Sequence, residues 1–264
     1  MLKGVIHIHS TYSDGDFSLA ELRETFLSAG CTFALVSDHA ESFDHDKLES
    51  YRHDCASLSD EHFRFVPGLE YECEKRLHVL GYGVTSLVTT KDPEEVIRHI
   101  AAERGISVIA HPSDASFSWI ETFQTLPDGI EVWNSKYDGR YALRPATVRL
   151  LQRLQQRKPD LRAFYGQDLH WKRQYRGLYT MVSCREPSQD SVLRALAQGE
   201  FFACKGALKL PSSGQVPEQL LNRFEVIQGR FRRLREVVGG GKELLKRFGL
   251  SVPEPIKAQL RRIF

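Results

Sequence analysis

Histidines and carboxylates recur at the ends of short apolar runs through the first two thirds of the sequence. His7 and His9 lie in one such run, and Asp14 follows it. Alternate side chains of a strand point to the same face, so the rings of His7 and His9 should lie side by side. Similar groups follow the later runs. The candidate metal ligands are His7, His9, Asp14, His39, Glu70, His78, His111, Asp168 and His170.

These residue types indicate which ions could bind. Imidazole nitrogens and carboxylate oxygens without thiolates favour zinc, manganese or iron over copper(I) or iron–sulfur clusters. Nine ligands are too many for one ion and predict two or three divalent ions. Because only three of the nine are carboxylates, the cluster keeps a positive charge that attracts an anion such as phosphate. Closely spaced ions also lower the pKa of bound water, so the pattern predicts hydrolysis of phosphate esters.

Apolar runs alternate with amphipathic segments over residues 1–204, which predicts an α/β fold with a mainly parallel sheet. Helices should begin at Ser18 and at Asp92, and also cover residues 141–156 and 188–198. Scattered ligands can meet only if the strands curve around one axis, so we expect a closed or nearly closed barrel with the ligands on its carboxyl-terminal rim. Predicted strands cover residues 4–9, 33–37, 63–69, 77–82, 106–110, 129–133, 163–166, 179–183 and 201–204.

The ligand strings resemble those of a known family. HIHSTYSDG at residues 7–15 resembles the first motif of the PHP (polymerase and histidinol phosphatase) family, and SDH at residues 37–39 resembles its second. Glu70, His78 and residues 110–112 and 166–170 resemble the remaining motifs. The resemblance implies a distorted (β/α)7 TIM-like barrel. It also implies a phosphoesterase with a trinuclear site, in which a metal-bridging hydroxide attacks phosphorus.

The resemblance also implies how the ligands divide among three ions. Glu70 would bridge the first ion to the second, and Asp168 and His170 would also assist proton transfer. The first ion would be held by His7, His9, Glu70 and Asp168, the second by Glu70, His78 and His111, and the third by Asp14, His39 and His170.

Polar side chains that could bind the substrate follow the same strand ends. The planar guanidinium group of arginine suits phosphate oxygens. The expected substrate-binding residues are Asn134, Lys136, Arg140, Arg173 and Arg176.

Charge divides the chain unevenly. Residues 1–204 carry a net charge of −6 and residues 205–264 carry +8. We therefore expect a PHP phosphoesterase barrel over 1–204 and a basic, mainly helical segment packed on it over 205–264. Its helix, residues 219–238, should pack through Leu220, Phe224, Ile227 and Phe231, end at three glycines, and be followed by two short basic helices near 242–248 and 254–263. The basic face is either solvated or a nucleic-acid footprint.

Three functions are compatible with these features. The first is hydrolysis of a small phosphorylated metabolite or nucleotide. The alternatives are a nuclease-like phosphodiesterase acting on nucleic acid ends, and a non-catalytic metal-binding PHP domain that binds a partner. The five scattered cysteines contain no Cys-x-x-Cys pair, and we find no secretory signal or membrane-spanning run. A cytoplasmic protein with reduced thiols and no membrane contact is expected.

Overall fold

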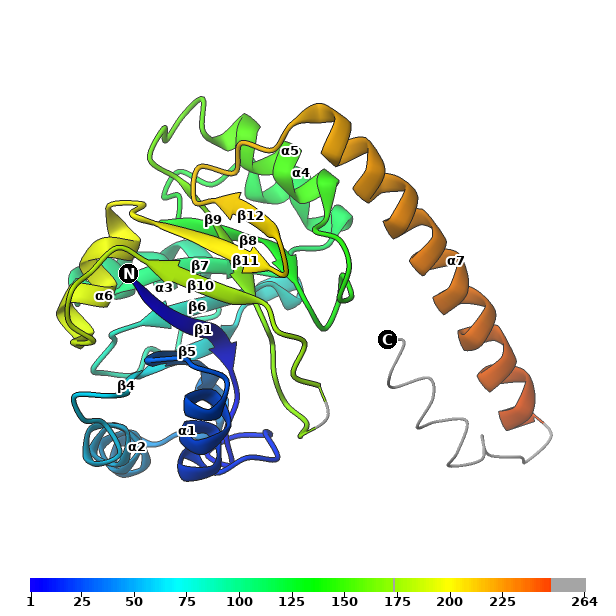
Figure 1. Cartoon of the computed structure of the whole chain (residues 1–264). Coiled ribbons are helices and arrows are strands. Elements are labelled where there is room, and N and C mark those ends of the chain that lie inside the picture. Colours follow the sequence, from blue (N-terminus) through cyan, green and yellow to red (C-terminus); the bar gives the residue numbers. More distant parts are fainter. Residues whose placement is uncertain (173, 248–264) are drawn as a thin grey trace.

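The computed structural model describes residues 1–172 and 174–247. Within these residues, the strands form two six-stranded mixed sheets (Figure 1). The first sheet has the order β12-β11-β10-β1-β2-β4, with β1 (Leu2–Ile8), β2 (Phe33–Val36), β4 (Arg64–Val66), β10 (Tyr179–Val182), β11 (Phe201–Lys205) and β12 (Leu208–Pro211). The second has the order β3-β5-β6-β7-β8-β9, with β3 (Asp38–His39), β5 (Gly68–Glu72), β6 (His78–Tyr82), β7 (Ile106–Ala110), β8 (Gly129–Asn134) and β9 (Arg162–Gly166).

All nine predicted runs contain strands, and the α/β class is confirmed. The expectation of a mainly parallel sheet is wrong, because β6 runs antiparallel to both β5 and β7. In the other sheet β10 runs antiparallel to β1 and to β11, and β11 runs antiparallel to β12. The pairing of β11 with β12 continues the sheet beyond residue 204.

The predicted barrel is not confirmed, because the described strands form two separate sheets and no closed barrel. The break falls where β2 stops before β3 and where β4 stops before β5; Pro67, which has no N–H to donate, lies in the second gap. The sheets meet again at the ends of β1 and β9, where His9 N donates to Leu169 O at 3.0 Å. The strand ends therefore gather at one rim without a continuous hydrogen-bond ladder.

Helices α1 and α3 begin where the sequence predicts, whereas the helix predicted over 141–156 begins at Pro145. Ser18 caps α1 by accepting from Glu21 N, while the Glu21 carboxylate accepts from Ser18 N in a capping box. Asp92 caps α3, whose first residue is Pro93. The helices are α1 (Leu19–Ser28), α2 (His45–Ser57), α3 (Pro93–Ala102), α4 (Phe117–Ile120), α5 (Pro145–Leu154), α6 (Gln189–Ala197) and α7 (Glu218–Arg247), with 3-10 turns at Ala40–Ser42, Glu74–Arg76 and Asp114–Ser116.

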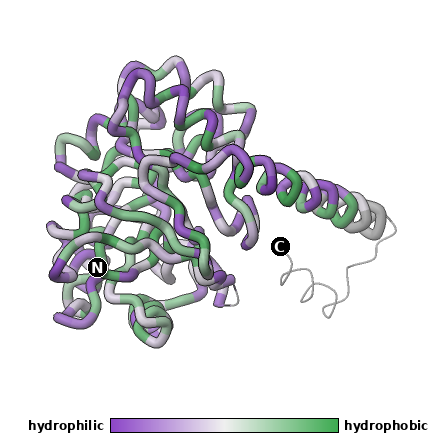
Figure 2. Tube along the Cα trace, turned by 45° about the horizontal axis from the view of Figure 1, so that its top comes forward, coloured by the Kyte–Doolittle hydropathy of each residue, from purple (hydrophilic) through white to green (hydrophobic). Residues whose placement is uncertain are grey.

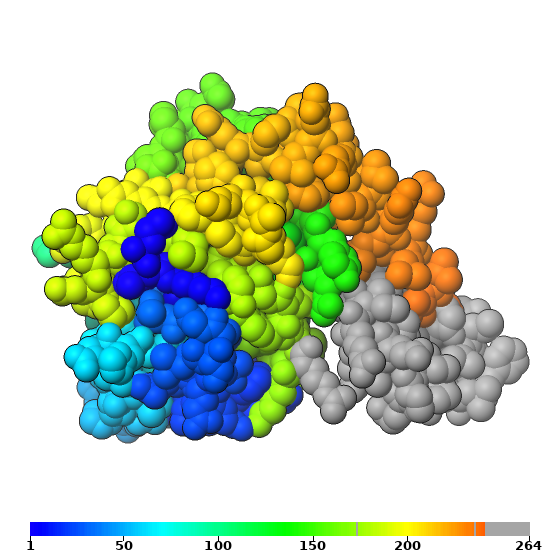
Figure 3. Space-filling model, in the orientation of Figure 1, coloured from blue at the N-terminus to red at the C-terminus, as the bar shows by residue number. Residues whose placement is uncertain are grey.

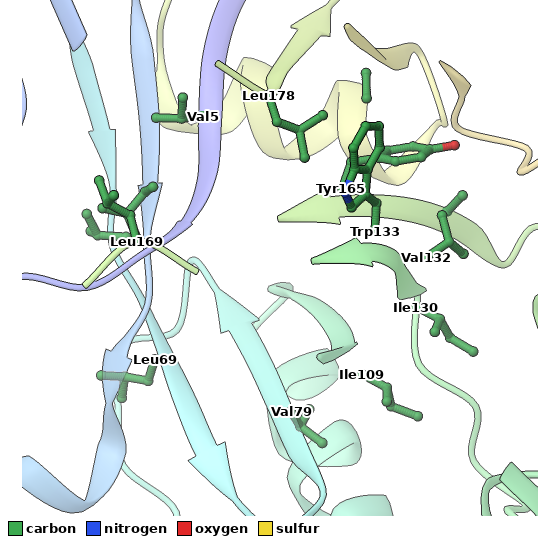
Figure 4. Close-up of a cluster of buried hydrophobic side chains, with 14 of the residues drawn as sticks. Val5, Leu69, Val79, Ile109, Ile130, Val132, Trp133, Tyr165, Leu169 and Leu178 are labelled. Carbon is green, nitrogen blue, oxygen red and sulfur yellow. The ribbon is translucent and has the colours of Figure 1, made fainter. Parts of the chain in front are cut away.

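Two hydrophobic clusters occupy opposite faces of the strands. Val5 belongs to the larger cluster and its neighbour Ile6 to the smaller one. Side chains from β5, β6, β7 and β8 join the larger cluster, and Figure 4 shows Leu69, Val79 and Ile109 among them. Because both faces of the strands are buried, their ends are held rigidly where the polar groups emerge.

Helix α7 leaves the body of the protein after its first turns. Leu221 and Phe224 are buried and join the main cluster, and in Figure 3 the orange start of α7 packs against green segments of the chain. Gln228 and Phe231 still contact residues 138–143, and beyond them the helix extends outward, with hydrophilic and hydrophobic residues along it (Figure 2). The predicted packing of Ile227 is wrong, because that side chain is 36% exposed.

The glycines at 239–241 do not end α7, which continues to Arg247. The predicted break and the separate helix at 242–248 are therefore wrong for the described residues. The predicted helix at 254–263 lies outside them. Among the described residues, no helix has both the length and the apolar composition that a membrane span requires.

Candidate metal centre

Unusual backbone geometry marks the strand ends that carry the candidate ligands. His7, His111 and Asp168 have positive φ angles of 61°, 27° and 50°. Such angles are uncommon outside glycine and concentrate at functional sites. At His7 the pairing of β1 with β2 shifts register between Ile6 and Ile8. The predicted strict alternation is thus interrupted, yet the rings of His7 and His9 still lie 5.4 Å apart.

Glu70 lies at the middle of the histidine cluster and is 1% exposed. Its Oε1 lies 2.7 Å from His78 Nδ1 and 3.1 Å from His111 Nε2. Its Oε2 lies 3.4 Å from His7 Nε2 and 3.2 Å from His9 Nε2. Burial alone would raise the pKa of this carboxyl, but the surrounding imidazoles hold it well below its usual range. Glu70 is therefore an ionised carboxylate with different histidines on its two oxygens.

A second group of candidate ligands forms around His170. Ligand atoms of His9, Asp14, His39 and His170 all lie within 4.8 Å of one another. The rings of His9 and His170 stack at 3.9 Å. The Asp14 side chain is 54% exposed, and although partial burial opposes it, contact with His170 holds its pKa below the usual value. This group therefore opens toward solvent on the Asp14 side.

Asp168 lies between these groups. Its Oδ1 lies 3.9 Å from His7 Nε2 and 3.1 Å from His170 Nδ1, and ligand atoms of His7, His9 and Asp168 form one further compact group. Lys136 Nζ approaches the same oxygen to 3.1 Å. Despite full burial, which would raise it, the pKa of Asp168 is held well below its usual range by His7 and His170.

The nitrogens of His9 test whether metal ions would fit here. The ring is buried, Nε2 lies 3.2 Å from Glu70 Oε2 and Nδ1 lies 3.5 Å from Asp14 Oδ1, yet neither nitrogen makes a well-aligned hydrogen bond with the described residues. A buried polar atom without a partner is costly, so such a nitrogen is expected to meet a ligand. The compact groups of imidazole nitrogens and carboxylate oxygens supply donors suited to zinc, manganese or iron. The residues present therefore fit divalent ions.

The structure brings all nine predicted ligands to one rim. The three compact groups overlap through shared members and differ in part from the division that the family resemblance implies. They are His9, Asp14, His39 and His170; His7, His9 and Asp168; and His7, Glu70 and His111. His78 joins through its 2.7 Å contact with Glu70.

Glu131 is a carboxylate that the sequence reading missed. It is 1% exposed on β8, and its Oε1 accepts from His7 Nδ1 at 2.8 Å. Its Oε2 accepts from the backbone N–H of His111 at 3.1 Å and from Asn134 Nδ2 at 3.0 Å. A carboxylate behind a ligating histidine fixes the ring orientation and raises its basicity. The sequence feature that could have identified Glu131 is an acidic residue in the middle of the apolar run at residues 129–133.

Asp38 holds the loop that carries Asp14. Its carboxylate accepts from the backbone N–H and hydroxyl of Ser10, both at 2.8 Å. It also accepts from the backbone N–H of Ser13 at 3.1 Å and from the Ser13 hydroxyl at 2.6 Å. Four hydrogen bonds to one buried carboxylate fix this loop beside the strand ends.

The predicted substrate-binding residues fall into different environments. Asn134 is buried, and its Nδ2 donates to Asp168 at 3.1 Å and to Glu131. Lys136 Nζ lies 3.3 Å from both ring nitrogens of His170. Arg176 donates to the backbone oxygen of Ser135. Arg173 lies outside the described residues.

Three cations lie near one another, and one of them, Arg176, donates to Ser135 at the end of β8. Burial and the nearby guanidinium groups of Arg140 and Arg176 lower the pKa of Lys205 to about 8. Arg140 Nε is buried and forms no hydrogen bond with the described residues. Positive charge beside the metal centre is suited to an anionic substrate.

Two aromatic rings flank the centre. Tyr137 is 46% exposed, and its ring lies 4.6 Å from that of His111. Trp171 is 53% exposed, and its ring lies 5.8 Å from that of His170. The mouth of the site therefore offers apolar surface as well as charge.

Comparison with known proteins gives one match among curated sequences. No family model matches this chain. A segment is 25% identical over 134 residues to the DNA polymerase/3'-5' exonuclease PolX of Bacillus subtilis. The match covers 42% of this chain and 24% of that protein, so the chain spans about a quarter of this relative's length.

Solved structures share the fold. A two-domain Bacteroides vulgatus protein, described as containing a predicted PHP-like metal-dependent phosphoesterase, aligns with TM-score 0.60 and 18% identity over 84% of this chain and 68% of that one. PsfC from Pseudomonas syringae aligns with TM-score 0.55 and 17% identity over 88% of this chain and 98% of that one. A Bifidobacterium adolescentis protein, with the inferred activity of a metal-dependent phosphoesterase, aligns with TM-score 0.50 and 15% identity over 74% of this chain and 96% of that one. The predicted resemblance to PHP-like proteins is confirmed for the fold.

Proposed function

We propose that this protein is a metal-dependent phosphoesterase that holds two or three divalent ions among its nine clustered ligands. The observation that carries this proposal is the set of three overlapping ligand groups, each with donor atoms within 4.8 Å of one another. When bound, such ions would lower the pKa of water and stabilise charge on the phosphoryl oxygens. The fold shared with PHP-like phosphoesterases supports the same activity.

The carboxylates have distinct roles in this proposal. Glu70 contacts four histidines through two oxygens, so it is placed to bridge neighbouring ions. Asp168 and His170 would assist proton transfer to the leaving oxygen. They can act together because His170 Nδ1 lies 3.1 Å from Asp168 Oδ1. Glu131 would keep His7 in one orientation through its 2.8 Å hydrogen bond.

Lys136 is the side chain best placed to meet the phosphate. Its Nζ lies 3.1 Å from Asp168 Oδ1 and 3.3 Å from both ring nitrogens of His170, so it reaches the edge of two ligand groups. An ammonium there would hold a phosphoryl oxygen as a point charge. Asn134 and Arg176 support the surrounding backbone and carboxylates in this scheme.

A small phosphorylated metabolite or nucleotide is the proposed substrate. The alternative is a nuclease-like phosphodiesterase, which the basic residues of α7 and the similarity to an exonuclease favour. Salt dependence separates these alternatives, because each phosphate contact with nucleic acid adds roughly 0.7–0.9 to the log–log slope of binding. A steep rise of KM with salt supports the nuclease, and a shallow one supports the small ester.

Phosphate release after metal loading tests the proposed function. The purified chain should be loaded separately with manganese, zinc and iron and screened against phosphate monoesters and diesters. We expect turnover that chelation abolishes and that re-addition of metal restores. Metal binding without turnover of any ester would instead support the non-catalytic alternative.

A further inference from the structure

The loop between β8 and α5, residues 135–144, passes directly beside the candidate metal centre. It carries Lys136, whose Nζ lies 3.1 Å from Asp168 Oδ1. The next residue, Tyr137, places its ring 4.6 Å from that of His111. The conformation of this loop therefore determines where a cation and an aromatic ring stand relative to the ligands.

Helix α7 contacts this loop through one polar side chain. Gln228 Nε2 donates to the backbone oxygens of Asp138 at 2.9 Å, Ala142 at 2.8 Å and Leu143 at 3.3 Å. A side-chain amide has two N–H protons, so the three carbonyls share them. Asp138 belongs to the first half of the loop, and Ala142 and Leu143 belong to the second half. The Gln228 side chain therefore connects the two halves of the loop.

Phe231 completes the contact one turn further along α7. Gly139 has a φ of 84°, and a Cβ at that position would lie 2.9 Å from Phe231 Cζ. The backbone angle therefore favours glycine, and a Cβ there would also displace the Phe231 ring. From the opposite side, Trp133 Nε1 donates to Gly139 O at 2.8 Å. The loop is thus held between β8 and α7.

A groove remains beside these contacts. It has a volume of about 400 Å³ and is lined by Tyr137, Asp138, Arg144, Gln228 and Phe231, among others. This space lies on the α7 side of the loop. If the contacts with Gln228 were lost, a shift of the loop into this space would move Lys136 and Tyr137 relative to the ligands.

We propose that Gln228 is a positioning residue, which holds Lys136 at the metal centre through its hydrogen bonds to the loop at 135–144. This inference rests on the proposed function, because Lys136 is assigned there to the phosphate. It gives α7 a part in the site although α7 contributes none of the nine candidate ligands.

The test uses three substitutions in the full chain. Gln228→Met keeps the length of the side chain but removes its N–H donors, whereas Gln228→Lys keeps donors at a similar position. Gln219→Met is the matched control, because Gln219 is exposed on the same helix. Hydrogen–deuterium exchange of residues 135–144 and the affinity of the manganese-loaded protein for inorganic phosphate are measured.

Gln228→Met should exchange faster at residues 138–143 and bind phosphate about 5- to 10-fold more weakly, as expected for loss of a hydrogen-bond anchor. Gln228→Lys and Gln219→Met should resemble the wild type. A Gln228→Met protein that matches Gln219→Met in both measurements would overturn the inference. If Gln228→Met does not fold, Gln228→Ala, which also removes the N–H donors, replaces it with the same expectation.

A double-mutant cycle separates positioning from general stability. If Gln228 acts through Lys136, adding Gln228→Met to Lys136→Ala should weaken phosphate binding no further. Additive losses would contradict the inference. If the wild-type protein with manganese binds no phosphate, the proposed function fails, while the exchange measurement still decides whether Gln228 holds the loop.

Discussion

Buried carboxylates orient the histidines of the centre. Glu70 contacts imidazoles through both oxygens, and Glu131 supports His7 and the backbone of His111 from behind. Each acid is 1% exposed, so solvent does little to weaken these contacts. The histidines are thereby fixed before any ion arrives, which lowers the cost of ordering them on binding.

Glu131→Gln should weaken metal binding without unfolding the protein. The amide keeps the shape of the side chain but loses the charge that orients His7, and loss of such a partner typically lowers metal affinity by about 10- to 100-fold. Titration with zinc or manganese measures the change. Glu49→Gln, at an exposed position on α2, is the control and should bind as the wild type does. Equal affinities for both variants would show that Glu131 does not support the centre.

Glu70→Gln should be more damaging than His78→Ala. Glu70 is proposed to bridge two ions, so its neutralisation removes charge from both, whereas His78 contacts only one oxygen of Glu70. Metal content and phosphate release measured on both variants compare the two losses. The bridging role is wrong if Glu70→Gln keeps metal and activity while His78→Ala loses both.

The sequence predicted the nine residues that gather at the centre, but not the residues that support them. Each of the nine is a polar residue close to an apolar run, which is visible in local sequence. Glu131 was missed because its partner His7 is 124 residues away, and no local pattern connects them. The φ angle of 61° at His7 was likewise invisible, because it depends on the register of β1 against β2.

Strand ends and the loops that follow them place these residues. Gly166, the last residue of β9, leaves room for Glu131, because a Cβ there would overlap Glu131 Oε1 and lie 3.0 Å from His7 Cβ. Because Gly166 on β9 has no side chain, Glu131 on β8 can form its hydrogen bond with His7 on β1.

Gly166→Ala should displace Glu131 and lower both stability and metal affinity. The added methyl group overpacks a buried position, which typically costs about 1–3 kcal/mol. Gly240→Ala is the matched control, because a Cβ there meets no atom within 4 Å. Alanine in a helix should stabilise this site by up to about 1 kcal/mol. Thermal unfolding measures both changes, and a stable Gly166→Ala protein with normal metal affinity would contradict the packing argument.

Helix starts that carry a capping signal were predicted better than the end of α7. Capping at Ser18 and Asp92 depends on neighbouring residues and was confirmed. The glycines at 239–241 predicted a break, but each glycine costs only about 1 kcal/mol in a helix. The leucines, lysines and glutamate that follow favour helix, so α7 continues to Arg247. The short connections between β5 and β6 and between β11 and β12 allow only antiparallel pairing, so local sequence could have predicted part of the mixed sheets. The pairing of β1 with β10 joins distant segments, and no local pattern encodes it.

The whole molecule joins two sheets at one rim and adds α7 to the outside of that rim. Leu221 and Phe224 anchor the helix on the body, and Gln228 reaches the loop beside the centre. The division of the chain at residue 204 stays a prediction, and the described contacts favour a body that includes the start of α7.

Truncation at two positions should distinguish the start of α7, which contacts the body of the protein, from its outer end. A chain ending at residue 240 keeps Leu221, Phe224, Gln228 and Phe231, so kcat on a small phosphate ester should stay within about twofold of the full chain, as for changes away from structural contacts. A chain ending at residue 217 loses these contacts and should be less stable, with a higher KM. If the shorter chain matches the full one in stability and KM, α7 has no part in the site.

Metal content and phosphate release, measured on the same purified sample, decide whether the nine clustered residues form a catalytic metal centre. We predict about two to three divalent ions per chain, and activity that falls and recovers in step with ion content as metal is removed and restored. Glu70→Gln should reduce both together. Less than one ion per chain after metal loading, or ester hydrolysis that persists when the protein has been stripped of metal, would contradict the account.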